Sequence, residues 1–304
     1  MRRALLIVLL ALAPFAFAPA TVAAQGARPA LTRPLRIVAA ENFYGDIAAQ
    51  LAGNNAQVLS VLKNAAADPH LFEPDISTAR AVAEADLVVY NGLAYDVWME
   101  RLLAAASAPH RRVVIAASVL PRDALRRNPH LWYDTAVVAR VARAITAELT
   151  ALDPGRRAEY AMRLDRFLAS LHPIDTQIGQ LRGRFAGERI AATEPIAQYL
   201  TDAIGLAMSN ARFQLAVMND TEPSARDTEE FERSLEGHSV RALIYNPQVS
   251  STAVERLLEI ARRSGVPVVG MTETEPGGVD YQQWMQGELD ALGRGLLGGA
   301  PRPH

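Results

Sequence analysis

The strongest constraint on the fold is an alternation of strand and helix patterns that occurs twice. In the first half, strand patterns at 35–40, 57–63, 86–90 and 112–116 alternate with helical patterns at 46–52, 74–85, 95–106 and 134–152. Such alternation predicts a parallel sheet covered by helices on both faces. After Gly187 it resumes, with strands expected at 189–192, 214–217, 242–245 and 266–269 and helices at 196–204, 227–235, 252–263 and 281–297.

A long helical stretch separates the two runs. Asp153-Pro154 predicts its start, because proline fits the first helical position and aspartate is favoured just before it. The pattern continues to about residue 184, some 30 residues or roughly 45 Å, with a kink expected at Pro173. We therefore predict an α/β fold of two lobes, each a mainly parallel sheet with flanking helices, joined by one long spine helix. The expected boundaries are 25–152 for the N-terminal lobe, 153–186 for the spine helix and 187–304 for the C-terminal lobe.

Residues 1–24 have the pattern of a secretory signal peptide. Arg2 and Arg3 precede an apolar run over 4–17, and small residues follow up to Ala24. The run is too short and wrongly flanked for a membrane span, so we expect cleavage near Ala24 and export to the periplasm. The chain has no cysteine, which excludes disulfides, thiolate ligands and an acyl anchor on an N-terminal cysteine.

The charge of the exported chain argues against one class of partner. Loss of Arg2 and Arg3 lowers the basic count from 31 to 29 against 33 acidic residues, a formal net charge of −4. A mildly acidic chain without a basic run is a poor candidate for binding nucleic acid or anionic lipid surfaces. We therefore expect no nucleic-acid partner.

Two histidines stand in matched contexts. His70 follows Asp68-Pro69 and His130 follows Asn128-Pro129, so a proline stiffens the backbone before each imidazole. Imidazoles presented from stiff loops are candidate metal ligands.

Ligands of open α/β sheets bind beyond the carboxyl ends of the strands. Polar residues expected at these ends are Glu41, His70 and His130 in the first half, and Glu194 and Glu273 in the second. Two imidazoles from one lobe and two carboxylates from the other would form a four-residue cage in a cleft between the lobes.

Four segments together resemble the periplasmic solute-binding proteins of zinc and manganese ABC importers. These segments are Asp68-Pro69-His70-Leu71-Phe72-Glu73-Pro74, Ala85-Asp86-Leu87-Val88-Val89-Tyr90-Asn91-Gly92, Asn128-Pro129-His130-Leu131-Trp132 and Glu222-Pro223-Ser224-Ala225. The resemblance runs from about residue 36 to about residue 297. It implies two α/β lobes joined by a rigid helix, a membrane permease as partner, and a monomer.

The resemblance also implies a ligand set of His70, His130, Glu194 and Glu273. Glu194 falls where zinc-specific members usually carry histidine, and in this respect resembles manganese-type members. Glu273 falls where aspartate is commoner, and Glu275 is a rival for this position. The chain lacks the long loop, rich in histidine and acidic residues, that many zinc members carry.

The donor set bears on the identity of the metal cargo. Two neutral imidazoles and two carboxylates nearly neutralise a divalent ion, and carboxylates that bind through both oxygens permit coordination above four. These properties favour Mn²⁺, whereas three histidines and one carboxylate would suit tetrahedral Zn²⁺ better. Because of this donor set we expect manganese as the physiological cargo. Intrinsic affinity still favours Zn²⁺, so we expect zinc to bind as well in vitro.

Alternatives remain at the level of function. The same donors could hold the catalytic ion of a secreted metal-dependent hydrolase, although the chain has no His-Glu-x-x-His, Gly-x-Ser-x-Gly or Walker motif. A third alternative, a surface adhesin, comes from descriptions of some family members and has no independent support in these residues.

Alternatives also remain for single residues. Glu194 could simply be an acid at a helix N-terminus followed by Pro195. Glu41 and Glu222 are expected to line the cleft or support the ligands. The remaining histidines, which lack the context of His70 and His130, are expected in solvent: His110, His172, His238 and His304.

Overall fold

A computed structural model describes residues 33–64, 72–120, 128–219, 221–249 and 251–299. It contains two four-stranded parallel sheets with equivalent strand orders, β2-β1-β3-β4 and β6-β5-β7-β8. The strands of the first sheet are β1 (Leu35–Glu41), β2 (Ala56–Leu62), β3 (Leu87–Tyr90) and β4 (Arg112–Ile115). Those of the second are β5 (Arg189–Ala192), β6 (Ala207–Met208), β7 (Leu243–Tyr245) and β8 (Val268–Gly270).

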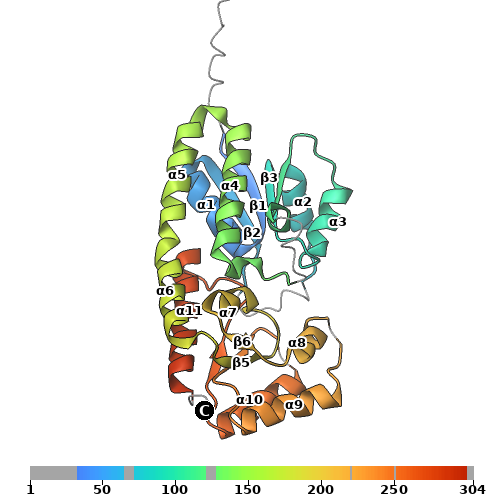
Figure 1. Cartoon of the computed structure of the whole chain (residues 1–304). Helices are drawn as coiled ribbons and strands as arrows, with labels where there is room; N and C mark the ends of the chain where they lie inside the picture. The colour runs from blue at the N-terminus through green and yellow to red at the C-terminus, as the bar shows by residue number, and fades with distance from the viewer. Residues whose placement is uncertain (1–32, 65–71, 121–127, 220, 250, 300–304) are drawn as a thin grey trace, which may run out of the picture.

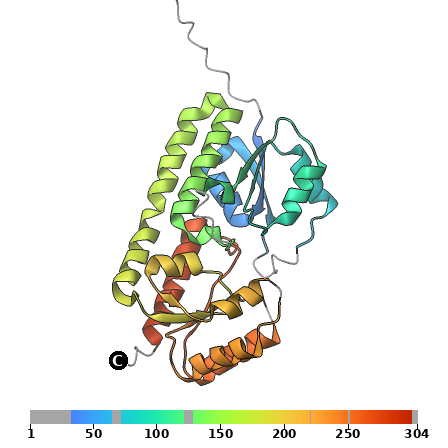
Figure 2. The ribbon, with the colours of Figure 1, turned by 45° about the vertical axis from the view of Figure 1, so that its right-hand side comes forward.

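Helices cover both faces of the first sheet (Figure 2). They are α1 (Asn42–Ala52), α2 (Ile76–Glu84), α3 (Val97–Ala105) and α4 (Thr135–Leu152). Successive side chains of a strand point to opposite faces, and in β1 Ile37 packs in the cluster with α1 and α4 whereas Val38 packs in the cluster with α2 and α3. Both faces of β1 are therefore core, as expected of a parallel sheet.

The second sheet is surrounded in the same way. Its helices are α7 (Gln198–Ile204), α8 (Ala211–Met218), α9 (Ala225–Glu236), α10 (Thr252–Arg263) and α11 (Tyr281–Gly298). Short 3-10 turns lie at Gly53–Asn55, Ala116–Val119, Leu131–Tyr133 and Pro154–Arg156. Within the described ranges, no helix has the length and apolar character needed to cross a membrane.

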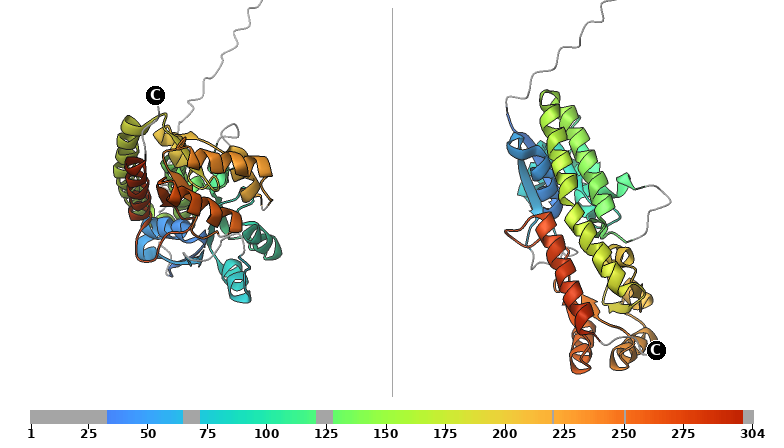
Figure 3. Two further views of the ribbon diagram at one scale, coloured as in Figure 1. Left: turned by 90° about the horizontal axis from the view of Figure 1, so that it is seen from below. Right: turned by 60° about the vertical axis from the view of Figure 1, so that its left-hand side comes forward.

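Two helices placed end to end connect the sheets (Figure 1): α5 (Arg157–Ser170) and α6 (His172–Phe185). Pro173 lies in the first turn of α6. Proline has no N–H and its ring clashes with the carbonyl four residues earlier, which accounts for the interruption at Leu171. Leu171 keeps helical backbone angles (φ −80°, ψ −21°), so the predicted spine is present as two segments. α11 runs beside α6 (Figure 3).

One hydrophobic cluster extends through both lobes. It includes Ile37 of β1, Phe167 of α5, Leu181 of α6 and Leu289 of α11. A separate cluster packs α8, α9 and α10 on the other face of the second sheet. Because close-packed interiors resist deformation, the continuous cluster favours small relative movements of the lobes.

The strand predicted at 214–217 is wrong. These residues belong to α8, and the strand that pairs with β5 is Ala207–Met208. A short apolar run does not distinguish a strand from a buried helix. Here the aromatic contact of Phe213 with Phe231 of α9, at 5.0 Å between ring centroids, packs the segment as a helix.

Candidate metal centre

The candidate site lies where loops from the carboxyl ends of both sheets meet. His130 follows the loop after β4, and Glu194 and Glu273 follow β5 and β8. All three side chains are at least 97% buried. The 65–71 segment, and with it His70, lies outside the described residues.

The two ring nitrogens of His130 have different surroundings. Its Nδ1 lies 2.6 Å from Oδ1 of Asn128, and because an amide oxygen only accepts hydrogen bonds, Nδ1 carries the proton. In the neutral imidazole this tautomer leaves the lone pair on Nε2, and this buried atom has no hydrogen-bond partner among the described residues. A metal-binding histidine characteristically donates its other ring N–H in this way.

Asn128 also fixes its own orientation. Its Nδ2 donates to the carbonyl of Pro195 at 2.8 Å and to Oε1 of Gln198 at 3.2 Å, which leaves Oδ1 for His130. Asn128 thus links two parts of the site: it orients His130, and it is hydrogen-bonded to the loop that carries Glu194.

Glu273 is brought to His130 from the other lobe. Its Oε1 lies 3.5 Å from Nε2 of His130. Two ligand atoms about 2.1 Å from one ion, at a tetrahedral angle, lie about 3.4 Å apart. The separation of this nitrogen and this oxygen therefore suits a shared transition-metal ion.

Neutral donors hold the Glu273 carboxylate. Oε1 accepts from Nδ2 of Asn246 at 2.8 Å, and Oε2 accepts from the hydroxyl of Tyr95 at 2.7 Å. The backbone N–H of Glu273 donates to Oε1 of Gln248 at 2.6 Å. These hydrogen bonds orient the carboxylate and leave its charge for a cation.

Glu194 is not in the first turn of a helix. Helix α7 begins at Gln198, and its N-cap is Ala197, so helix-dipole stabilisation does not account for Glu194. Its loop is positioned by a hydrogen bond from Thr193 N to the Ile244 carbonyl at 3.0 Å.

The rival Glu275 faces helix α1. Its backbone exchanges two hydrogen bonds with the side chain of Asn42, at 2.6 and 3.1 Å. Burial, followed by the charges of Asp46 and Asp280, raises the pKa of Glu275 to about 8.

Aromatic rings enclose the site. The rings of Trp132 and His130 meet edge to face, with centroids 5.2 Å apart, and Tyr95 packs against both. Trp132 and Tyr133 are buried, as expected for packing residues. Such walls exclude water and strengthen electrostatic interactions between the site and a cation.

Two buried carboxyl groups, Glu41 and Asp96, lie close enough to Tyr95 to act on it electrostatically. Burial, and then the charge of Asp96, raises the pKa of Glu41 well above its usual value. Burial also raises the pKa of Asp96 to about 6, against the opposing effect of backbone N–H groups of Gly92 and Asn91. The sequence singled out Glu41 as a lining residue, but nothing local distinguished Asp96, Asn128 or Tyr95 as supporting groups.

Other sequence candidates lie elsewhere. His110, His172 and His238 are exposed, as is Glu222, and His304 lies outside the described residues. Across the described ranges, no three His, Cys, Asp or Glu side chains gather closely enough to hold a metal ion. Of the predicted four-residue set, His130, Glu194 and Glu273 are described, and the structure brings His130 and Glu273 into direct contact, at 3.5 Å between Nε2 and Oε1.

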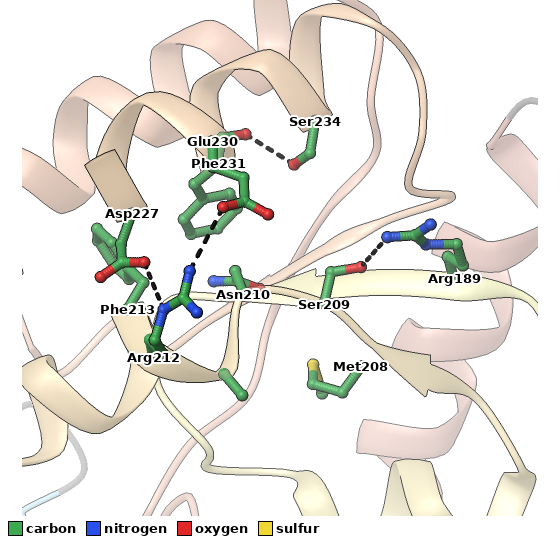
Figure 4. Close-up of a pocket in the computed structure, with 11 residues that line it drawn as sticks. Arg189, Met208, Ser209, Asn210, Arg212, Phe213, Asp227, Glu230, Phe231 and Ser234 are labelled. Atoms are coloured by element: carbon green, nitrogen blue, oxygen red, sulfur yellow. Dashed lines mark hydrogen bonds and ion pairs between the residues drawn. The ribbon is translucent and has the colours of Figure 1, made fainter. Parts of the chain in front are cut away.

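A pocket in the C-terminal lobe contains none of the predicted ligands (Figure 4). Arg212 lies on its wall and contacts Asp227 at 2.7 Å and Glu230 at 3.6 Å. The charge of Arg212 is therefore balanced by neighbouring carboxylates.

Comparisons with known proteins identify the architecture. Residues 37–295 match the family described as zinc-uptake complex component A, periplasmic. A manganese ABC transporter substrate-binding lipoprotein from Streptococcus pneumoniae, PsaA, is 22% identical over 283 residues, covering 86% of this chain and 89% of that protein.

Solved structures show the same fold. The periplasmic zinc-binding protein TroA from Treponema pallidum superposes with a TM-score of 0.73 at 19% identity, covering 87% of this chain and 99% of that chain. FpvC from Pseudomonas aeruginosa, solved in complex with Mn²⁺, gives a TM-score of 0.70 at 22% identity, covering 87% of this chain and 99% of that chain.

Proposed function

This chain belongs to the family of periplasmic zinc-uptake components, and from that premise we propose that it captures a divalent transition-metal ion and delivers it to an ABC-type membrane importer. The observation that carries the proposal is the buried Nε2 of His130, which has no hydrogen-bond partner among the described residues and lies 3.5 Å from Oε1 of Glu273. No catalytic step is involved, because the family consists of binding components.

The proposed ligands are His70, His130, Glu194 and Glu273. The burial of the last three and the orientation of His130 support this assignment. Two neutral imidazoles and two carboxylates would bring the net charge of the occupied site close to zero, which lowers the cost of burying the ion. Glu275 is retained as the rival of Glu273.

The cargo is proposed to be Mn²⁺ or Zn²⁺. The names of relatives in the family include both a manganese transporter component and a zinc-binding protein. Carboxylate donors suit Mn²⁺, whereas intrinsic affinity favours Zn²⁺. We propose manganese as the physiological cargo and zinc as a competing ion in vitro.

Release requires the donors of the two lobes to separate. Hydrogen bonds that cross between the lobes would have to break, among them Tyr95 to Glu273 and Tyr281 to the carbonyl of Trp132. The continuous core and the α5–α6 connection favour small rocking over wide opening.

The hydrolase alternative lacks support. The family match assigns a solute-binding role, and the chain carries none of the hydrolase motifs considered above. We also propose that the chain is monomeric and that residues 1–24 direct its export to the periplasm.

The metal content of the native protein tests the proposal. The protein is purified from the periplasm of its native cells without added metal, and the bound metal ions are quantified by elemental analysis. About one equivalent of manganese or zinc is expected, and removal by chelator followed by titration should restore it. A protein that is empty and binds neither ion on titration would refute the metal-capture function.

A further inference from the structure

The hydroxyl of Tyr95 crosses the boundary between the lobes to reach a proposed ligand. It donates to Oε2 of Glu273 at 2.7 Å, and Oε1 of the same carboxylate accepts from Asn246 at 2.8 Å. Oε1 is also the oxygen that lies 3.5 Å from Nε2 of His130. The two oxygens of Glu273 therefore have different roles in this arrangement.

An unusual backbone holds Tyr95 in place. The three residues that immediately precede Tyr95, which are Gly92, Leu93 and Ala94, have φ values of 80°, 55° and 62°. Leucine and alanine rarely adopt positive φ values. The carboxylate of Asp96 closes this loop by accepting from the backbone N–H groups of Asn91 at 2.5 Å and Gly92 at 2.8 Å. Backbone strain of this kind persists where the surroundings enforce it, and it often occurs at ligand-holding sites.

The aromatic ring of Tyr95 is also buried against other side chains. It is 8% exposed and packs against Trp132, with ring centroids 5.2 Å apart. Its hydroxyl is thus directed to one carboxylate oxygen by a strained loop and by an aromatic wall. The tyrosine does not need to be a metal ligand to influence the site.

We propose that Tyr95 determines metal specificity by occupying Oε2 of Glu273, so that this carboxylate offers only Oε1 to the ion. The inference rests on the metal-capture function proposed above. Chelation by both oxygens would place the ion in competition with the Tyr95 hydroxyl for Oε2. Single-oxygen binding keeps the coordination number low, which suits tetrahedral Zn²⁺, whereas Mn²⁺ is better accommodated by additional oxygen ligands. Tyr95 thus reduces the preference for manganese that two carboxylates would otherwise confer.

The test compares two tyrosine variants. Tyr95→Phe removes only the hydroxyl on the carboxylate. Tyr133→Phe is the matched control, because the Tyr133 hydroxyl donates at 2.8 Å to the carbonyl of Thr272, in the same loop but not on the carboxylate. The dissociation constants of Mn²⁺ and Zn²⁺ are measured for the wild type and both variants by competition with a chelating dye. X-ray absorption of the Mn²⁺ complexes gives the coordination number.

For Tyr95→Phe we expect the ratio of the Mn²⁺ to the Zn²⁺ dissociation constant to fall by about fivefold or more, with one additional oxygen around manganese. For Tyr133→Phe we expect the wild-type ratio and coordination. An unchanged ratio in Tyr95→Phe, or the same change in both variants, would overturn the specificity role. If the wild type binds neither ion, the proposed function itself fails, which is a separate result.

Discussion

The Nε2 atom of His130 lies 3.5 Å from Oε1 of Glu273, although one residue belongs to the N-terminal lobe and the other to the C-terminal lobe. The nitrogen is buried and its ring is oriented by Asn128 on the opposite side. The carboxylate is oriented by Asn246 and Tyr95. Both donors are therefore held at a separation that one ion could bridge.

Replacing His130 tests its role as a ligand. His130→Ala removes one of two predicted imidazole donors and leaves Glu273 without its partner, so tight binding of Mn²⁺ and Zn²⁺ should be lost. Calorimetric titration of the metal-free protein measures the effect. His110→Ala is the control, because His110 is exposed. Wild-type affinity in His130→Ala would exclude His130 as a ligand.

Replacing Asn128 tests the support behind His130. Asn128→Ala removes the acceptor for Nδ1–H and the link to Pro195, and loss of such supporting groups typically weakens metal binding about 10–100-fold. Chelator competition measures the change for both metals. Asn55→Ala is the control, since Asn55 contacts Glu159 on an exposed surface. Equal affinities for the two variants would contradict the orienting role.

Replacing Glu194 tests how the donor set selects the metal. Glu194→His would give three imidazoles and one carboxylate, a set that favours tetrahedral Zn²⁺, so the ratio of Zn²⁺ to Mn²⁺ affinity should rise. The same change at exposed Glu222 serves as the control. If Glu194→His and Glu222→His have the same ratio of Zn²⁺ to Mn²⁺ affinity, Glu194 is not a ligand.

Glu288 provides a test of pH-dependent stability. Burial raises its pKa from 4.5 to about 6. The folded state therefore binds the proton more tightly than the unfolded state does. The resulting stabilisation is complete below about pH 4 and is lost as pH rises through about 6, at a cost of about 2 kcal/mol.

The variant Glu288→Gln should remove this dependence. Its amide oxygen can still accept from Thr272 and Trp284 as Oε1 of Glu288 does. Denaturant unfolding at pH 4 and pH 7 should show that the variant loses less stability than the wild type over this interval. Exposed Glu236→Gln is the control. Identical pH dependence in wild type and Glu288→Gln would show that Glu288 does not titrate as expected.

The two sheets could be predicted because their strands are short apolar runs buried on both faces. Val88 of β3 and Ile244 of β7 are examples, each 0% exposed. The interruption near Pro173 followed from the missing N–H of proline. The predicted strand at 214–217 failed because local pattern did not reveal that Phe213 packs against Phe231.

The candidate ligands were easier to predict than their supports. His130 and Glu273 follow strands, so their convergence could be anticipated from the topology of parallel sheets. The contact of Tyr95 with Glu273 could not, because it depends on positive φ angles at Leu93 and Ala94, which neither residue type indicates. The roles of His70, His130, Glu194 and Glu273 as ligands stay predictions.

The most direct test of the account is the position of the bound ion, located by anomalous diffraction from crystals of the metal-loaded protein. The account predicts one Mn²⁺ or Zn²⁺ ion bonded to Nε2 of His130 and Oε1 of Glu273 at about 2.0–2.3 Å, with His70 and Glu194 completing the set. An ion bound elsewhere, with His130 and Glu273 still in contact only with each other and their protein partners, would contradict it.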